Sequence, residues 1–298
     1  MTALHEYWQH ALDELSRCPA RPEIEPLPLR STAFATLYGV RLSSLGPYRL
    51  FGYLSIPNGA GPFPAIYYAP KYQSVLEIIP QGTANLQRSR YVTFSLAGRG
   101  QRNADSPYAA MFPGLFTDGI DDAASYPFRG IVADSIRGLE FLVTRREVDS
   151  ARVVVAGNDV ALITAALGKG ATHAVTAPAL FYRTAELAPK TQAYPLEEIN
   201  DYLRLNPERR ADVEETLAYF DGISFADRIA CPIIVNVGLQ DNVVPPETGY
   251  ALFERIGSKD KHLYPYDGHG HDAGRARHTA VVDAFFARHL QGASEVRR

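Results

Sequence analysis

Three residues have the types and chain order of a hydrolytic catalytic set. Asp159 lies between the β-branched segment Val153–Val155 and the Ala-rich segment from Val160 to Leu167. Asp241 follows the apolar segment 232–238, and His269 follows the segment 261–266. A nucleophile, an acid and a histidine, each placed after a buried strand in this order, are typical of one large class of α/β enzymes. We therefore predict that Asp159, Asp241 and His269 share one site.

The residues around Asp159 predict a strand, a tight turn and a helix. A turn of this kind needs small residues two positions before and two positions after its centre, and Gly157 and Ala161 meet that need. This is the nucleophile elbow of α/β-hydrolases, whose usual pattern is G-x-S-x-G. In this chain the centre is Asp159, so the chemistry depends on what a carboxylate does at that position.

An ionised carboxylate needs no base to act as a nucleophile, whereas a serine does. Attack by Asp159 on a saturated carbon would give an alkyl-enzyme ester. His269, oriented by Asp241, would then activate water to hydrolyse that ester. Dehalogenases and epoxide hydrolases resemble this constellation. Attack on an ester carbonyl would give a mixed anhydride instead, and direct activation of water by Asp159 or His269 is a further route. Halide sites use indole donors, and Trp8 is the only tryptophan.

The backbone N–H groups of Val160 and Tyr72 are the expected oxyanion donors, by position. His271 and Asp272 lie near His269, but no other ligands with metal spacing accompany them. We therefore expect no metal and no cofactor.

The elements needed to position these residues predict an α/β fold. Strands alternate with helices through the second half of the chain, which indicates a mainly parallel, doubly wound sheet covered on both faces. We expect a single domain over residues 1–298, with an N-terminal extension over 1–30 that contains a helix over 5–17. The polar, helical segment 181–220 is interpreted as an insertion between core strands.

Composition excludes several other classes of protein. The chain has 298 residues, 46% of them apolar, and a formal charge of −3, so nothing favours nucleic acid or an anionic membrane. No apolar stretch reaches transmembrane length. Cys18 and Cys231 are the only cysteines, which is typical of a reduced compartment. Without an N-terminal signal pattern, a cytoplasmic location is expected.

Several motifs resemble the acetyl xylan esterase and cephalosporin-C deacetylase family of α/β-hydrolases over nearly the whole chain. The segments that carry the resemblance are Tyr7-Trp8 with Leu12–Leu15, Arg99-Gly100-Gln101, Tyr126–Gly130 with Asp134, Leu217–Gly222, and Gly238–Asp241 with Pro245-Pro246. The resemblance implies a hydrolase of short esters, often acetylated sugars. It also implies Asp241 as the triad acid and assembly into a homo-oligomer.

This chain departs from the family pattern at three motifs. The family's Gly-Gly-Ser-Gln-Gly is Gly157–Ala161 here, its His-Gly-Tyr is Pro70-Lys71-Tyr72, and its Gly-His-Glu is replaced within Gly268–Asp272. Spacing from the last strand favours His269 as the catalytic histidine, whereas the histidine–acid pair favours His271. We predict His269, with His271 as the alternative.

The prediction is a hydrolase of a small ester-like substrate that uses Asp159, His269 and Asp241. Three alternatives remain open. One is an Asp-nucleophile hydrolase of a carbon–halogen bond or an epoxide. Another is a catalytically inactive binding or assembly protein, and the third is a lyase or isomerase that transfers protons through the Asp/His pair.

Overall fold

The computed structural model describes residues 2–46, 48–71, 84–101, 104 and 111–291. Nine strands of these residues form one sheet in the order β1-β2-β3-β5-β4-β6-β7-β8-β9. The strands are β1 (Glu23–Pro26), β2 (Ala35–Ser43), β3 (Arg49–Pro57), β4 (Phe63–Tyr68), β5 (Val92–Leu96), β6 (Val148–Gly157), β7 (His173–Thr176), β8 (Ile233–Gly238) and β9 (Lys261–Tyr266).

The sheet is antiparallel at one edge and parallel over the rest. β1, β2, β3 and β5 pair antiparallel in that order. From β5 through β4, β6, β7 and β8 to β9 every pairing is parallel. The mainly parallel α/β sheet predicted from the sequence is confirmed.

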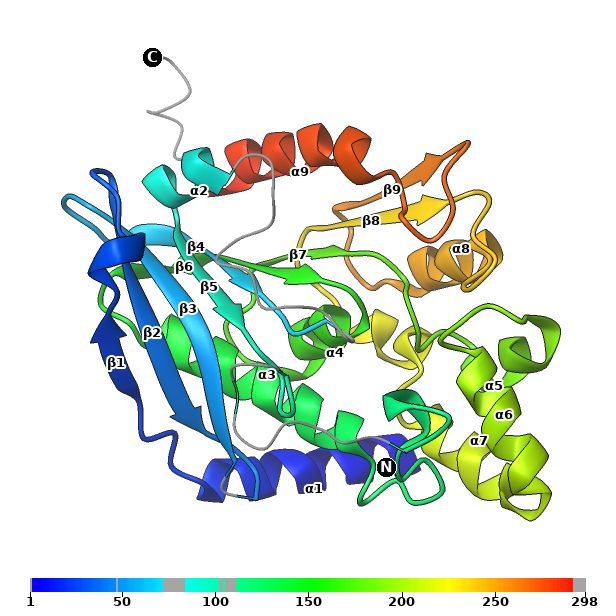
Figure 1. The fold of residues 1–298 in the computed structure, drawn as a ribbon. Coiled ribbons are helices and arrows are strands. Elements are labelled where there is room, and N and C mark those ends of the chain that lie inside the picture. The colour runs from blue at the N-terminus through cyan, green and yellow to red at the C-terminus, as the bar shows by residue number, and fades with distance from the viewer. Residues whose placement is uncertain (1, 47, 72–83, 102–103, 105–110, 292–298) are drawn as a thin grey trace.

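Helices cover both faces of the sheet (Figure 1). α2 and α9 lie on one face, and α1, α3 and α4 lie on the other. α5, α6 and α7 follow β7, and α8 connects β8 to β9. The bounds are α1 (Ala3–Arg17), α2 (Ala84–Arg90), α3 (Pro127–Val143), α4 (Asp159–Leu167), α5 (Thr184–Leu187), α6 (Glu197–Leu205), α7 (Arg210–Ala218), α8 (Pro246–Arg255) and α9 (Arg275–Leu290). Short 3-10 turns span Pro28–Arg30, Leu115–Thr117, Ala188–Lys190, Pro207–Arg209 and Gly222–Arg228.

β6 shows why a continuous apolar strand suits the centre of this sheet. Val153 and Val155 enter the larger hydrophobic cluster, whereas Val154 and Ala156 enter the cluster beneath α9. Successive side chains of a strand point to opposite faces, so a strand covered on both faces must be apolar at every position.

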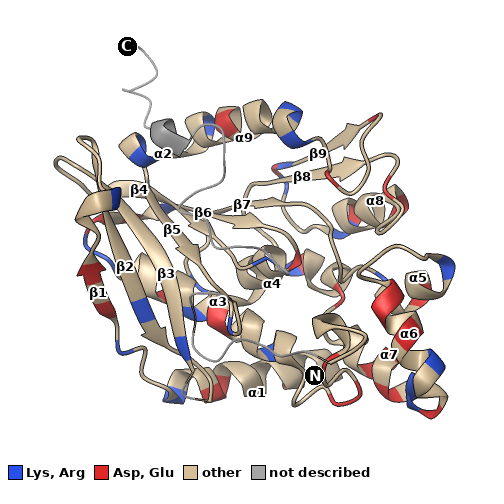
Figure 2. Cartoon of the chain, viewed as in Figure 1, with Lys and Arg blue, Asp and Glu red and all other residues tan. Residues whose placement is uncertain are grey.

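Charged residues are frequent on the helices α5, α6 and α7 that follow β7 (Figure 2). Several make helical ion pairs, such as Arg204 with Glu197 and Asp201. In the part of the chain that the structure describes, no helix is both long and apolar enough to cross a membrane.

Candidate active site

The strand–turn–helix predicted around Asp159 is present as β6, Gly157–Asn158 and α4. A Cβ at Gly157 would lie 3.1 Å from the Ala161 Cβ, so both positions must carry small residues. Asp159 is the first residue of α4. It is not one of the non-glycine residues with positive φ, which in the described chain are Arg21, Arg183, Ala273 and Arg275. The backbone strain that exposes the nucleophile of a usual elbow is therefore missing at Asp159.

The Asp159 carboxylate is held by the turn that follows β7. Its Oδ1 accepts hydrogen bonds from the backbone N–H groups of Ala179 and Leu180 at 3.1 Å each and of Phe181 at 3.4 Å. Leu180 also donates to Oδ2 at 3.1 Å. Asp159 is only 4% exposed. Burial raises the pKa of the Asp159 carboxyl, and the hydrogen bonds from Leu180, Ala179 and Phe181 oppose that rise.

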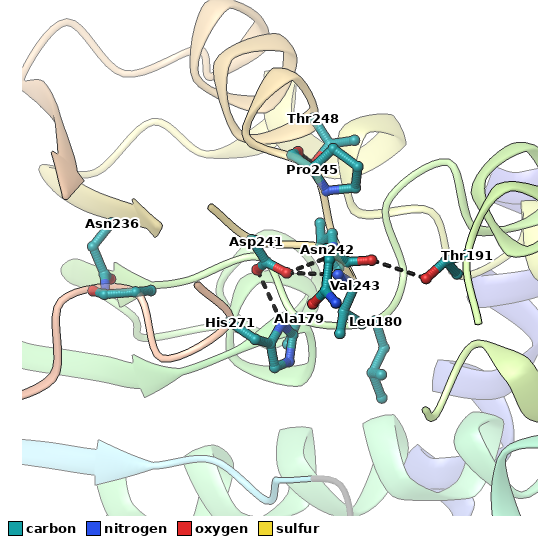
Figure 3. A network of polar contacts seen from close by, with 12 residues as sticks. Ala179, Leu180, Thr191, Asn236, Asp241, Asn242, Val243, Pro245, Thr248 and His271 are labelled. Carbon is teal, nitrogen blue, oxygen red and sulfur yellow. Dashed lines mark hydrogen bonds and ion pairs between the residues drawn. The ribbon is translucent and has the colours of Figure 1, made fainter. Parts of the chain in front are cut away.

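Asp241 is oriented as the acid of a histidine–acid pair. It follows β8, and its Oδ1 accepts hydrogen bonds from the backbone N–H groups of Val243 at 2.8 Å and Val244 at 2.9 Å. Its Oδ2 lies 3.0 Å from Nδ1 of His271 (Figure 3). The Asp241 side chain is 6% exposed and that of His271 is 39% exposed.

The histidine that contacts Asp241 is thus His271 and not His269, on which the sequence prediction rested. His269 Nδ1 lies 2.8 Å from Asp272 Oδ2 instead. Backbone contacts explain the difference, because the Gln240 N–H donates to the His269 carbonyl and a Cβ on Gly238 would lie 1.9 Å from the Gly270 carbonyl oxygen. This close packing fixes the loop on the end of β8, so that the residue two positions beyond His269 faces Asp241.

Carboxylates raise the basicity of His271. The hydrogen bond that His271 donates to Asp241 raises the pKa of His271 most, and burial lowers it. The negative charges of Asp241, Asp159 and Asp272 raise it further. Because the Asp241 carboxylate is an acceptor, Nδ1 of the neutral imidazole carries the proton and Nε2 is the basic nitrogen.

A small cavity lies between Asp159 and His271. Its volume is about 110 Å³, and its lining also includes Val160 and Lys71. Val160, at the start of α4, thus lines this cavity, and its role as an oxyanion donor stays a prediction. Tyr72, the other expected oxyanion donor, lies outside the described residues. Asp159, His271 and, through its hydrogen bond, Asp241 are brought together.

Two features of the site were not predicted from the sequence. The turn 179–181 that binds Asp159 is about twenty residues away in the chain, and its only signal is its place directly after β7. Thr191, in the segment between β7 and β8, donates from Oγ1 to the Asn242 carbonyl at 2.9 Å and so supports the acid loop (Figure 3). Among the described residues, no group of three or more His, Cys, Asp or Glu could hold a metal ion.

The sheet and site together define an α/β-hydrolase. Comparison with known proteins then identifies the family, because the model described as acetyl xylan esterase (AXE1) matches residues 2–289. The chain belongs to the acetyl xylan esterase family.

Individual relatives agree with the family assignment. The chain is 24% identical over 277 residues to acetyl esterase Axe7A of Xylanibacter ruminicola, a match that covers 88% of this chain and 62% of that protein. The chain thus spans less than two thirds of that relative's length. It is similar to an acetyl xylan esterase structure from Paenibacillus sp. R4, with a TM-score of 0.88, 25% identity and coverage of 97% and 95% of the two chains. Acetyl xylan esterase 1 of Thermoanaerobacterium sp. JW/SL YS485 gives a TM-score of 0.84, 26% identity and coverage of 97% and 94%.

Proposed function

We propose that this protein hydrolyses esters of small acyl groups, acetylated xylan-type sugars among them, with water as the direct nucleophile. The observation that carries the proposal is the His271–Asp241 pair, joined at 3.0 Å, with His271 lining the same cavity as the start of α4. His271 Nε2 would take a proton from water as the water oxygen attacks the carbonyl carbon. The C–O bond to the alcohol then breaks, and the proton passes from His271 to the departing alkoxide.

The acyl group is small because the cavity is small. Ligand pockets for drug-sized molecules have volumes of roughly 300–1,000 Å³, whereas this cavity has about 110 Å³. The Val160 N–H at the first turn of α4 is the proposed donor to the developing oxyanion, and Tyr72 stays a prediction for the second donor.

Asp159 is proposed as a positioning residue and not as the nucleophile. Its Oδ1 accepts hydrogen bonds from backbone N–H groups. Its φ is not positive, so its backbone is not strained like that of an exposed elbow nucleophile. It fixes the turn 179–181 that lines the acyl cavity, and its negative charge raises the pKa of His271.

The same observations favour one alternative, a binding protein that has lost catalysis. Without a hydroxyl or a free carboxylate at the elbow, the site lacks the covalent nucleophile of the family pattern. The dehalogenase alternative finds less support, because the Trp8 indole N–H donates to the Tyr219 carbonyl at 2.8 Å. The epoxide, lyase and isomerase alternatives remain open.

The test is hydrolysis of 4-nitrophenyl acetate, butyrate and octanoate. We expect turnover of the acetate, with kcat/KM falling at least tenfold for the octanoate because its chain exceeds the cavity. A protein that binds acetylated sugars but hydrolyses none of the three esters would support the binding protein. Equal rates on acetate and octanoate would contradict the role of the small cavity.

A further inference from the structure

A second, larger cavity opens beside the candidate active site. Its volume is about 670 Å³, and it lies between the carboxyl ends of β4, β6 and β7 and the helix α9. The two cavities share four lining residues, which are Lys71, Asn158, Ala179 and His271. His271 therefore borders both the small cavity and the large one, as expected of a base that acts between two parts of one substrate.

The difference in volume indicates which cavity would receive the acyl group of an ester and which would receive the alcohol. Of these two cavities, only the larger has a volume in the range of ordinary ligand sites. Its charged lining is balanced, with Lys71 and Arg275 against Asp272 and Asp283, and Arg275 Nε lies 3.5 Å from Asp272 Oδ2. Val175, Val282 and Phe286 give it an apolar wall. A balanced, half-apolar lining suits a neutral alcohol and disfavours a strongly charged one.

Asn158 occupies the boundary between the cavities. As the residue before Asp159 it ends the turn after β6, and it lines both spaces. Its backbone carbonyl accepts a hydrogen bond from Thr176 Oγ1 at 3.2 Å, which fixes the backbone. Its side-chain amide caps no helix N–H and makes no hydrogen bond within the described residues.

We propose that the larger cavity receives the alcohol part of the ester and that the Asn158 side-chain amide determines which alcohol is accepted. The amide offers two donors and one acceptor oxygen. A hydroxyl or ether oxygen next to the ester bond would form a hydrogen bond with the Asn158 amide. An aryl alcohol without such groups would form none, so the amide would not strengthen its binding. This inference rests on the proposed ester hydrolysis only in that the bound alcohol is taken to be part of the ester substrate. Binding of the alcohol itself is measurable without turnover.

The experiment compares wild type with Asn158→Leu and Asn158→Gly. Calorimetric titration with xylobiose measures binding of a hydroxylated alcohol, and kcat/KM is measured for monoacetylated xylobiose and for 4-nitrophenyl acetate. Loss of one neutral hydrogen bond corresponds to about a 3- to 10-fold effect. We expect that loss in xylobiose affinity and in kcat/KM for the sugar ester. The loss of kcat/KM on 4-nitrophenyl acetate should be smaller than on the sugar ester, because the aryl alcohol has no hydroxyl group for the amide to bind.

Asn206→Leu is the matched control, because Asn206 lies beyond α6, its amide donates to the Tyr202 carbonyl, and it lines neither cavity. Xylobiose binding without hydrolysis of either ester would refute the proposed function and leave the alcohol site standing. No xylobiose binding by wild type would overturn the alcohol site, as would an equal loss on both esters in the Asn158 variants. The melting temperature of each variant separates misfolding from these outcomes.

Discussion

Replacing Asp159 by alanine tests whether this carboxylate holds the turn 179–181. In wild type, the buried N–H groups of Ala179 and Leu180 each donate to Asp159 at 3.1 Å. A buried donor left without an acceptor costs about 1–3 kcal/mol, so two of them cost about 2–6 kcal/mol. Burying the Asp159 carboxylate is itself unfavourable, so its removal offsets part of this cost. We expect a net loss of about 2–3 kcal/mol.

Urea unfolding of wild type, Asp159→Ala and Asp159→Asn measures this loss. Asparagine keeps one acceptor oxygen but turns its NH₂ group toward a backbone donor, so it should fall between wild type and alanine. The control is Asp272→Ala, which removes a side chain that is 23% exposed and pairs with His269 and Arg275. We expect that control to unfold at nearly the same urea concentration as wild type, because exposed ion pairs contribute little to stability. Equal stability of Asp159→Ala and wild type would refute the assigned role of the carboxylate.

Three further predictions concern Asp159, the His271–Asp241 pair, and the two histidines His173 and His278. Asp159→Ser places a hydroxyl next to His271, so it should raise the rate of 4-nitrophenyl acetate hydrolysis and produce an initial burst of 4-nitrophenol. A loss of rate would show that His271 is not aligned with the elbow. The value of kcat/KM should fall as the pH drops through the pKa of His271. Asp241→Asn should move the midpoint of this fall to lower pH, because the negative charge hydrogen-bonded to His271 is lost. An unmoved midpoint would show that Asp241 does not act on the catalytic base. Burial lowers the pKa of His173 and of His278 from 6.5 to about 4. Between these pH values the unfolded chain therefore binds more protons than the folded chain. The stability present above pH 6.5 should be lost as the pH falls toward 4. Urea unfolding across this range should show a shallower pH dependence in His278→Phe.

The fold could be predicted from the sequence because its signals are local. The run Val153–Val155 and the small residues Gly157 and Ala161 specified the strand, turn and helix that the structure contains as β6 and α4. The N-terminal helix expected over 5–17 is α1, Ala3–Arg17. α2 was not predicted, since its seven residues, Ala84–Arg90, lack an apolar period.

The site was less predictable because its decisive contacts are distant in the sequence. His269 and His271 each follow a glycine and each pair with an aspartate, so spacing alone could not separate them. The choice depends on how the loop 268–271 packs against Gly238. The orientation of the Asp159 carboxylate depends in the same way on N–H groups about twenty residues further along the chain.

The most direct test of the account is the rate of 4-nitrophenyl acetate hydrolysis by His271→Gln and His269→Gln beside wild type. The two histidines are a matched pair, each with Nδ1 at 2.8–3.0 Å from an aspartate, and only His271 borders the cavities at the elbow. General-base catalysis contributes about 10²–10⁴-fold. We expect His271→Gln to lower kcat/KM at least 100-fold and His269→Gln to change it less than about threefold. Loss of activity in His269→Gln with activity kept in His271→Gln would contradict the account.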